Sequence, residues 1–139
     1  MPIYDVDDHD LDILRKTVFM EARGESADGQ AAVVYVIVTR ARLNKSYWGG
    51  SKIADVCLKP GQFECWNSST NIDTQSQEYK NVENIVNDVI FYNEAFKEHD
   101  DGSDHYNNPD KEGYREWTNN CDKTKKIGGY QFYKTKPGF

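Results

Sequence analysis

The sequence predicts an α+β fold that is predominantly α-helical, with a small β-hairpin or sheet. Three segments carry apolar residues at the spacing of an α-helix, whereas the segments with strand character are short. The 139 residues are 37% hydrophobic and 13% aromatic, which is enough for one domain with its own core. We therefore expect a single domain over residues 1–139, without a second, binding domain.

The first helix is predicted for residues 10–24. Leu11, Leu14 and Val18 recur at helical spacing, an Asp is available as the N-cap, and Gly24 follows as a stop signal. These apolar residues define the side of the helix that should face the core.

Glu21 falls on the same side of this helix as the apolar residues, since successive residues turn by about 100°. A carboxyl group that loses water in such a place favours its protonated form, which suits a general acid. Alternatively, Glu21 pairs with Arg23 or Arg40 at the helix end and has a structural role. The helical spacing alone does not decide between a general acid and a structural role for Glu21.

The second segment starts at Ser26 or Asp28 and continues to Asn44. Its β-branched residues favour a strand, but its length favours a helix, because strands of this length are unusual. Arg40 and Arg42 also suit the C-terminal end of a helix dipole. We predict a helix. The longest apolar stretch, residues 31–38, is far shorter than the ~20 residues that span a bilayer.

The middle of the chain predicts one more long helix. Thr74 offers an N-cap with Gln77 three residues later, and apolar side chains follow at helical spacing. They are Tyr79, Val82, Val86, Val89 and Phe96. Before this helix, we predict a short helical turn at 53–58, a short strand at 62–66 from the alternation in QFECW, and a polar loop at 67–71.

The last third of the chain predicts loops and a closing hairpin. Residues 99–113 have almost no apolar side chain and indicate a long loop, which in a compact domain is often functional. A short helical piece is predicted at 114–120, followed by a strand or hairpin at 127–134.

Charge and composition exclude several kinds of function. The formal net charge of -6 removes the attraction that nucleic acids and anionic membranes exert on basic proteins. No CxxC or CxxH spacing occurs, and the three His residues are scattered, so neither a metal site nor a cofactor is predicted. A disulfide between Cys57 and Cys65 is left open, with Cys121 as the odd thiol.

Four blocks of the sequence identify a family. They are EARGESADGQAAVVYVIVTRAR from Glu21, KPGQFECWN from Lys59, HYxNP at 105–109 and IGGYQFYK at 127–134. In this order, they resemble the SleB-type cell wall hydrolases, and the resemblance covers residues 11–134. It implies a lysozyme-like fold, with the sheet beside an active-site cleft. The family's closing block usually has a His where this chain has Tyr130.

The resemblance implies cleavage of the bond between N-acetylmuramic acid and N-acetylglucosamine in peptidoglycan. The first Glu of the EARGE block is the family's catalytic carboxylate, which corresponds to Glu21. In the lytic transglycosylase reaction, this one group acts as acid and then as base, whereas hydrolysis requires a second carboxylate. Glu25 is the first candidate for that second carboxylate, and it could instead brace the next helix. The others are Glu64, Asp104 and Asp110.

The resemblance also suggests substrate-binding residues. Gln62 and Trp66 belong to the block beside the cleft, where an amide and a ring suit acetamido groups and sugar faces, while Phe63 is expected in the core. Tyr106 and Asn108 are expected to form hydrogen bonds with the substrate. His105 is a candidate for binding or for a second acid or base, and it could instead brace the loop.

Peptidoglycan glycan strands are therefore the expected partner, and the protein is expected to act as a monomer without inserting into a membrane. The first ten residues have neither a basic start nor an apolar stretch, so no signal peptide is expected. This favours a phage lysin, which reaches the wall through a holin-type lesion or inside a virion. The alternative is a catalytically idle peptidoglycan-binding or virion structural module that retains the fold.

Overall fold

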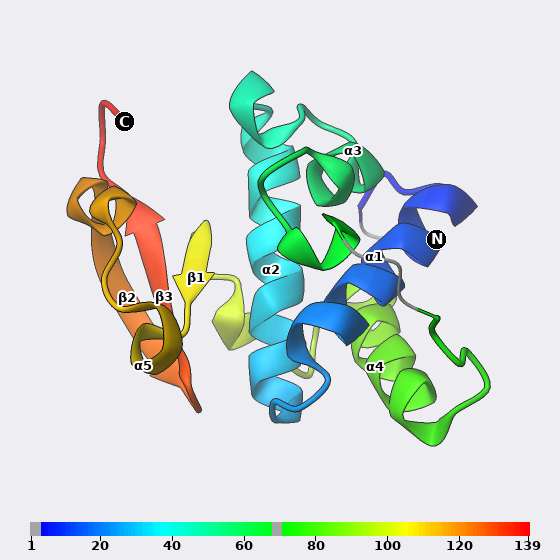
Figure 1. Ribbon diagram of the computed structural model, residues 1–139. Helices are drawn as coiled ribbons and strands as arrows, with labels where there is room; N and C mark the ends of the chain where they lie inside the picture. Colours follow the sequence, from blue (N-terminus) through cyan, green and yellow to red (C-terminus); the bar gives the residue numbers. More distant parts are fainter. Residues whose placement is uncertain (1–3, 68–70) are drawn as a thin grey trace.

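The computed structural model describes residues 4–67 and 71–139, which form a helical layer beside a small sheet (Figure 1). The helical layer contains α1 (Asp8–Ala22), α2 (Ala27–Leu43), α3 (Ile53–Leu58) and α4 (Gln77–Asn87). The sheet contains β1 (His105–Asn107), β2 (Cys121–Ile127) and β3 (Tyr130–Thr135). α2 lies between the sheet and the other long helices (Figure 1). The predicted α+β, predominantly helical class is confirmed.

Helix α1 begins at a reciprocal cap. The side chain of Asp7 accepts a hydrogen bond from the Asp10 amide at 2.8 Å, and the Asp10 carboxylate accepts one from the Asp7 amide at 3.1 Å. The helix ends at Ala22, two residues before the predicted end. Gly24 does not have a positive φ, so the chain turns here without the left-handed glycine that the sequence suggested.

Asp10 also connects α1 to α3, although its side chain is buried at 1% exposure. Its carboxylate accepts hydrogen bonds from the Ala54 amide at 2.9 Å and from Lys52 Nζ at 3.2 Å. Replacing Asp10 by Ala leaves the buried Ala54 N–H without a partner, so we expect the free energy of unfolding to fall by about 2 kcal/mol. Urea unfolding followed by circular dichroism measures this change.

The control for this prediction is Asp12→Ala on the same helix. The Asp12 side chain is 51% exposed and pairs only with Lys16, one turn later. A solvent-exposed pair of this kind contributes about 0.5 kcal/mol or less. Equal losses of stability in the Asp10 and Asp12 variants would show that the α1–α3 connection is not important for stability.

Helix α2 is the centre of the core. Every residue from Gly29 to Ala41 is buried, and the helix contacts α1, α3, α4 and β1. Ser26 caps its N-terminus through the Gly29 amide, and Asn44 ends it in the left-handed conformation. The predicted helix is confirmed, because burial on all sides outweighs the strand propensity of its β-branched residues.

The predicted strand at 62–66 is wrong. The structure has a 3-10 turn, η2 (Glu64–Asn67), in which the Trp66 amide donates to the Phe63 carbonyl at 3.3 Å. The turn brings Phe63 and Trp66, three residues apart, against the helical layer. Residues 62–66 alternate as a strand would, but they do not pair with any strand of the described sheet. The predicted loop at 67–71 lies largely outside the described residues.

Helix α4 starts two residues later than predicted. Its N-cap is Ser76, which accepts a hydrogen bond from the Tyr79 amide, and not Thr74. A π-helical turn, η3 (Asp88–Tyr92), continues it, and Asn93 ends it in the left-handed conformation. The predicted core residues Tyr79, Val82, Val86 and Val89 are buried, whereas Phe96 lies beyond the helix.

The sheet is antiparallel in the order β1-β3-β2, so β3 is its central strand. β2 and β3 form the predicted hairpin at 127–134. Gly128 in its turn has a φ of +56°, which favours glycine, and a Cβ built there would lie 2.9 Å from the Glu25 carboxylate, which would have to move. The short predicted helix at 114–120 is the 3-10 helix η5 (Glu116–Asn120).

The predicted long loop at 99–113 is only partly correct. It contains β1, which pairs with β3 so that Tyr106 faces Phe132, and the short helix α5 (Pro109–Glu112). Pairing with β3 satisfies the backbone N–H and C=O groups of β1, and this distant partner gives no signal in the polar sequence of the segment. The remaining short helices are η1 (Ser46–Trp48) and η4 (Lys97–His99).

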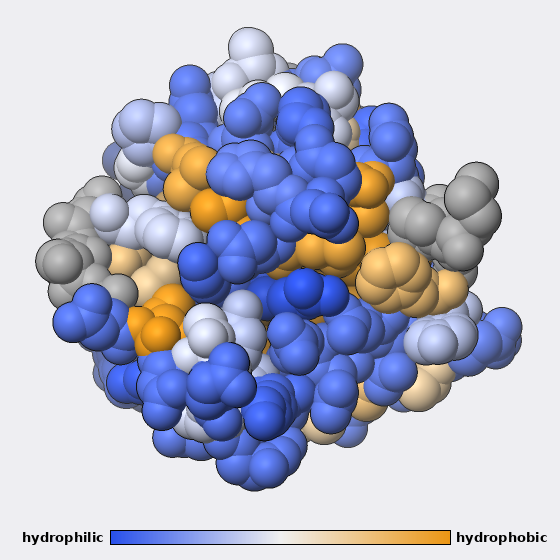
Figure 2. All heavy atoms as spheres, turned by 90° about the vertical axis from the view of Figure 1, so that its right-hand side faces the viewer, coloured by the Kyte–Doolittle hydropathy of each residue, from blue (hydrophilic) through white to orange (hydrophobic). Residues whose placement is uncertain are grey.

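The outer side of the helical layer is mostly hydrophilic, with apolar side chains visible between polar ones (Figure 2). Within the described residues, no helix combines the length and the apolar character that a bilayer crossing requires. The largest fully buried side chains lie on α1, α2, α3, η3 and β3.

Candidate active site

A cleft of about 710 Å³ lies between the sheet and the helical layer. Its lining comes from the end of α1 and the α1–α2 connection, from α2, η1 and the 61–64 turn, and from β1, α5, η5, β2 and β3. Of the candidate residues from the sequence, the cleft contains Glu21, Glu25, Gln62, Phe63, Glu64, His105, Tyr106 and Asn108. Segments that are far apart in the sequence therefore meet here.

Glu21 lies at the C-terminal end of α1 and is half-buried in the cleft. Its Oε1 accepts a hydrogen bond from the Tyr106 hydroxyl at 2.7 Å. The Tyr130 hydroxyl donates to the backbone carbonyl of the same residue at 2.5 Å. The sequence left open that Glu21 pairs with Arg23 or Arg40 and has a structural role. In the described part of the chain, neither arginine forms an ion pair with Glu21.

Both tyrosines stay protonated and therefore act as donors. Burial and the nearby Glu21 carboxylate raise the pKa of Tyr106 well above its usual value. Burial, with Glu21 and Glu25, raises the pKa of Tyr130 to about 12. Each hydroxyl therefore keeps the proton that it donates to Glu21.

The other carboxylates differ in their relation to the cleft. Glu25 and Glu64 line it, and so does Glu112, which the sequence did not suggest. The Glu25 side chain lies close to the hairpin turn, since a Cβ built on Gly128 would lie 2.9 Å from its Oε1. Asp104 and Asp110 are not among the lining residues.

His105 is held in one orientation. Its Nδ1 lies 2.9 Å from Asp104 Oδ1, and its ring stacks on Trp117 at 4.8 Å and meets the edge of Trp48 at 5.5 Å. Burial raises the pKa of Asp104, but hydrogen bonds and charge from His105 and Thr135 outweigh burial and hold it below the usual value. Nδ1 therefore donates to an ionised Asp104, and His105 both braces β1 and reaches the cleft.

The cysteines are free thiols in the structure. Burial raises the pKa of Cys57 to about 12, and burial with the Glu21 carboxylate raises that of Cys65 to about 12. Cys121 lines the cleft at 3.9 Å from His105 Nδ1, the nitrogen that already binds Asp104, and burial raises its pKa. None of the three is arranged as an activated nucleophile.

The remaining predicted binding residues are used in different ways. Asn108 lines the cleft, but its side-chain oxygen caps α5 through the amides of Asp110 and Lys111. Gln62 lines the cleft with its Oε1 turned toward Arg40. Trp66 is not among the lining residues, because its ring packs on the core and its indole N–H donates to Thr17 at 3.0 Å.

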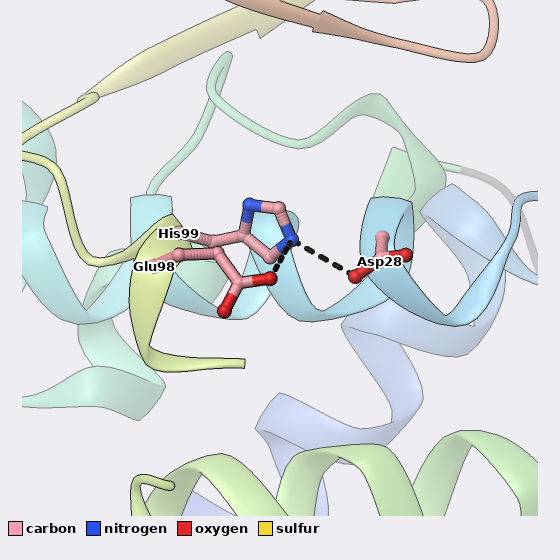
Figure 3. A group of neighbouring side chains, drawn as sticks. All are labelled: Asp28, Glu98 and His99. Carbon is pink, nitrogen blue, oxygen red and sulfur yellow. Dashed lines mark hydrogen bonds and ion pairs between the residues drawn. The ribbon is translucent and has the colours of Figure 1, made fainter. Parts of the chain in front are cut away.

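One group of described side chains could serve as cation ligands: Asp28, Glu98 and His99 (Figure 3). His99 Nε2 lies 3.0 Å from Asp28 Oδ1 and 3.8 Å from Glu98 Oε1. These contacts tie η4 to the first turn of α2, away from the lining of the cleft. Ion pairing accounts for them, and the structure does not bring His9 or His105 into the group.

The comparisons with known proteins agree with this fold. The family model described as Cell Wall Hydrolase matches residues 24–133, which includes the cleft residues from Glu25 to Tyr130 and begins just after Glu21. Among solved structures, the chain is similar to the catalytic domain of the germination-specific lytic transglycosylase SleB from Bacillus anthracis. The two share 25% identity with a TM-score of 0.71 over 94% of this chain and 98% of that one. No curated protein is significantly similar.

Proposed function

Because the chain belongs to the cell wall hydrolase family, we propose that it cleaves peptidoglycan between N-acetylmuramic acid and N-acetylglucosamine, with Glu21 as the acid and base. The observation that carries this proposal is that one of the cleft carboxylates, Glu21, has its orientation fixed by the Tyr106 hydroxyl at 2.7 Å. Glycoside cleavage requires a positioned proton donor of this kind. The reaction is a lytic transglycosylation, as in the similar SleB domain.

The reaction proceeds in two proton transfers through Glu21. The protonated carboxyl group gives its proton to the glycosidic oxygen, the bond from that oxygen to the muramyl C1 breaks, and the N-acetylglucosamine hydroxyl leaves. The carboxylate then takes the proton of the muramyl 6-hydroxyl as that oxygen bonds to C1. The product is a 1,6-anhydromuramyl end, no water is consumed, and Glu21 returns to its protonated form.

The geometry supports a positioning role for the two tyrosines. Tyr106 donates to the carboxylate and stabilises the ionised state that forms between the two steps, and Tyr130 fixes the end of α1 through the Glu21 carbonyl. Gln62, His105 and Asn108 then remain as binding residues along the cleft. Trp66 supports the cleft from the core side through Thr17.

A transglycosylase of this kind does not need a second carboxylate, and this gives a test of the role of Glu25. We expect Glu25→Gln to retain at least about a third of the wild-type rate and to release the same anhydro ends, since the transglycosylation needs no carboxylate that activates water. Mass spectrometry of muropeptides released from purified peptidoglycan measures both quantities. Reducing ends from the wild type, lost together with activity in the Glu25 variant, would indicate hydrolysis with Glu25 as the second carboxylate.

All residues in this proposal come from one chain, so the reaction needs no second copy and we expect a monomer. The substrate places the site of action at the bacterial cell wall. Delivery as a phage lysin remains our preferred route. The idle-module alternative predicts that purified protein leaves peptidoglycan intact, which the same muropeptide measurement decides.

A further inference from the structure

Arg40, near the C-terminal end of α2, is a buried cation whose hydrogen-bond partners are neutral. Its side chain is 6% exposed. Nε donates to the backbone carbonyl of Asp104 at 2.7 Å, and Nη1 donates to Gln62 Oε1 at 3.4 Å. The guanidinium also lies over the Trp48 ring at 5.3 Å. These contacts orient the group but do not neutralise it.

No carboxylate of the described residues lies within 4.0 Å of this guanidinium, although other basic side chains of the protein form such pairs. The Asp104 carboxylate acts on Arg40 electrostatically but is directed at His105 and Thr135. Burial lowers the pKa of Arg40, which reflects the cost of removing the charge from water. A buried charge is costly unless an opposite charge is close to it.

The guanidinium of Arg40 is part of the cleft wall. Its Nη2 has no hydrogen-bond partner among the described residues. Arg15 Nε is the one fully buried side-chain nitrogen or oxygen of the described residues without a partner, so Nη2 is not completely enclosed by protein. An oriented guanidinium with open N–H groups suits a planar oxyanion such as a carboxylate.

We propose that Arg40 binds a carboxylate of the muramyl residue or of its attached peptide, and that this contact selects peptidoglycan over other N-acetylated glycans. The inference rests on the proposed function, since peptidoglycan differs from chitin by the lactyl group on every second sugar and by the peptides joined to it. Strands without peptides have free lactyl carboxylates, whereas strands with peptides have carboxylates only on the peptide. Arg40 is a specificity residue, separate from the proton transfers at Glu21.

The test compares ligands on protein that does not turn over. Glu21→Gln protein is titrated calorimetrically with peptide-free glycan strands, with peptide-bearing strands and with chitin oligosaccharides of equal length. At least one carboxylate-bearing ligand should bind about tenfold more tightly than chitin, and the ligand that does so identifies the source of the carboxylate. Increasing the salt concentration should reduce this preference. Equal affinity for all three ligands overturns the proposal.

Substitution of Arg40 gives the second part of the test. In the Glu21→Gln background, Arg40→Gln should lower the preference to less than twofold while binding of chitin is retained, and Arg40→Lys should keep part of the preference. Arg42→Gln is the matched control, because Arg42 is on the same helix but pairs with Asp100 outside the cleft lining. An equal loss for every ligand means that Arg40 is only structural and overturns the proposal.

Two further outcomes also test the Arg40 proposal. If circular dichroism shows that Arg40→Gln does not fold, the comparison of ligands and salt concentrations with Glu21→Gln protein still tests the proposal, because that protein retains Arg40. If wild-type protein cleaves no peptidoglycan and Glu21→Gln binds none of the ligands, the proposed function fails. Cleavage by the wild type without any preference for carboxylate-bearing strands sinks the Arg40 inference alone.

Discussion

Replacing Glu21 by Gln is expected to reduce the release of muropeptides from purified peptidoglycan by about 10³-fold, because the amide can neither donate nor accept the proton in the two steps. The fold should be retained. Glutamine has nearly the same shape, and its side-chain oxygen can still accept the hydrogen bond from Tyr106. Mass spectrometry of the products and circular dichroism of the protein measure the two effects.

The Glu25→Gln variant is the control for this result, since it removes a neighbouring cleft carboxylate with the same chemical change. A loss of equal size in both variants would indicate that the cleft needs negative charge in general and not one proton donor. Equal product from wild type and Glu21→Gln would contradict the catalytic assignment and favour the idle-module alternative.

Glu21 could be found from the sequence because its signal is local. Helical spacing places it with Leu14 and Val18 on one side of α1, and the structure has both apolar residues in the core while Glu21 reaches the cleft at the end of the same side. Helix α2 could be predicted in the same way, since length and caps are local properties. The error at 62–66 arose because five residues fit both an alternating strand and a turn with Phe63 and Trp66 on one side.

The partners of Glu21 could not be predicted, because they are distant in sequence. Tyr106 reaches it across 85 residues and Tyr130 across 109, and no local pattern reports such contacts. The sequence assigned Tyr106 to the substrate, but the structure shows it on the carboxylate. Tyr130 stands where the family usually has His, and its hydrogen bond to the Glu21 carbonyl is the contribution that this chain makes from that position.

The proposed role of Arg40 could not be predicted from the sequence, for a different reason. A basic residue near the end of a helix is usually explained by the helix dipole, and Arg40 and Arg42 look equivalent in that respect. The structure separates them, because Arg42 is exposed and pairs with Asp100 whereas Arg40 is buried without a carboxylate. Burial and the absence of a nearby carboxylate arise only when the chain is folded, so the structure and not the sequence suggests that Arg40 binds a ligand.

Replacing Tyr106 by Phe is expected to lower kcat roughly 30-fold with little change in KM, since a hydrogen bond to a charged group contributes on the order of 1.5–3 kcal/mol. The phenyl ring preserves the packing of Tyr106 on Tyr130 at 5.1 Å and on Phe132 at 5.8 Å, so only the hydroxyl is removed. Loss of this donor removes the contact that orients the reacting carboxylate and stabilises its charge, so the effect should fall on kcat.

Tyr130→Phe is the matched variant, because its hydroxyl donates to the backbone carbonyl of Glu21 and not to the carboxylate. We expect a loss of less than about fivefold in kcat, since a neutral hydrogen bond contributes roughly 1 kcal/mol. Steady-state kinetics on a soluble peptidoglycan fragment separate the two variants. If Tyr106→Phe instead raises KM and leaves kcat unchanged, Tyr106 binds substrate, as its position in the HYxNP block suggested, and Glu21 holds its orientation without it.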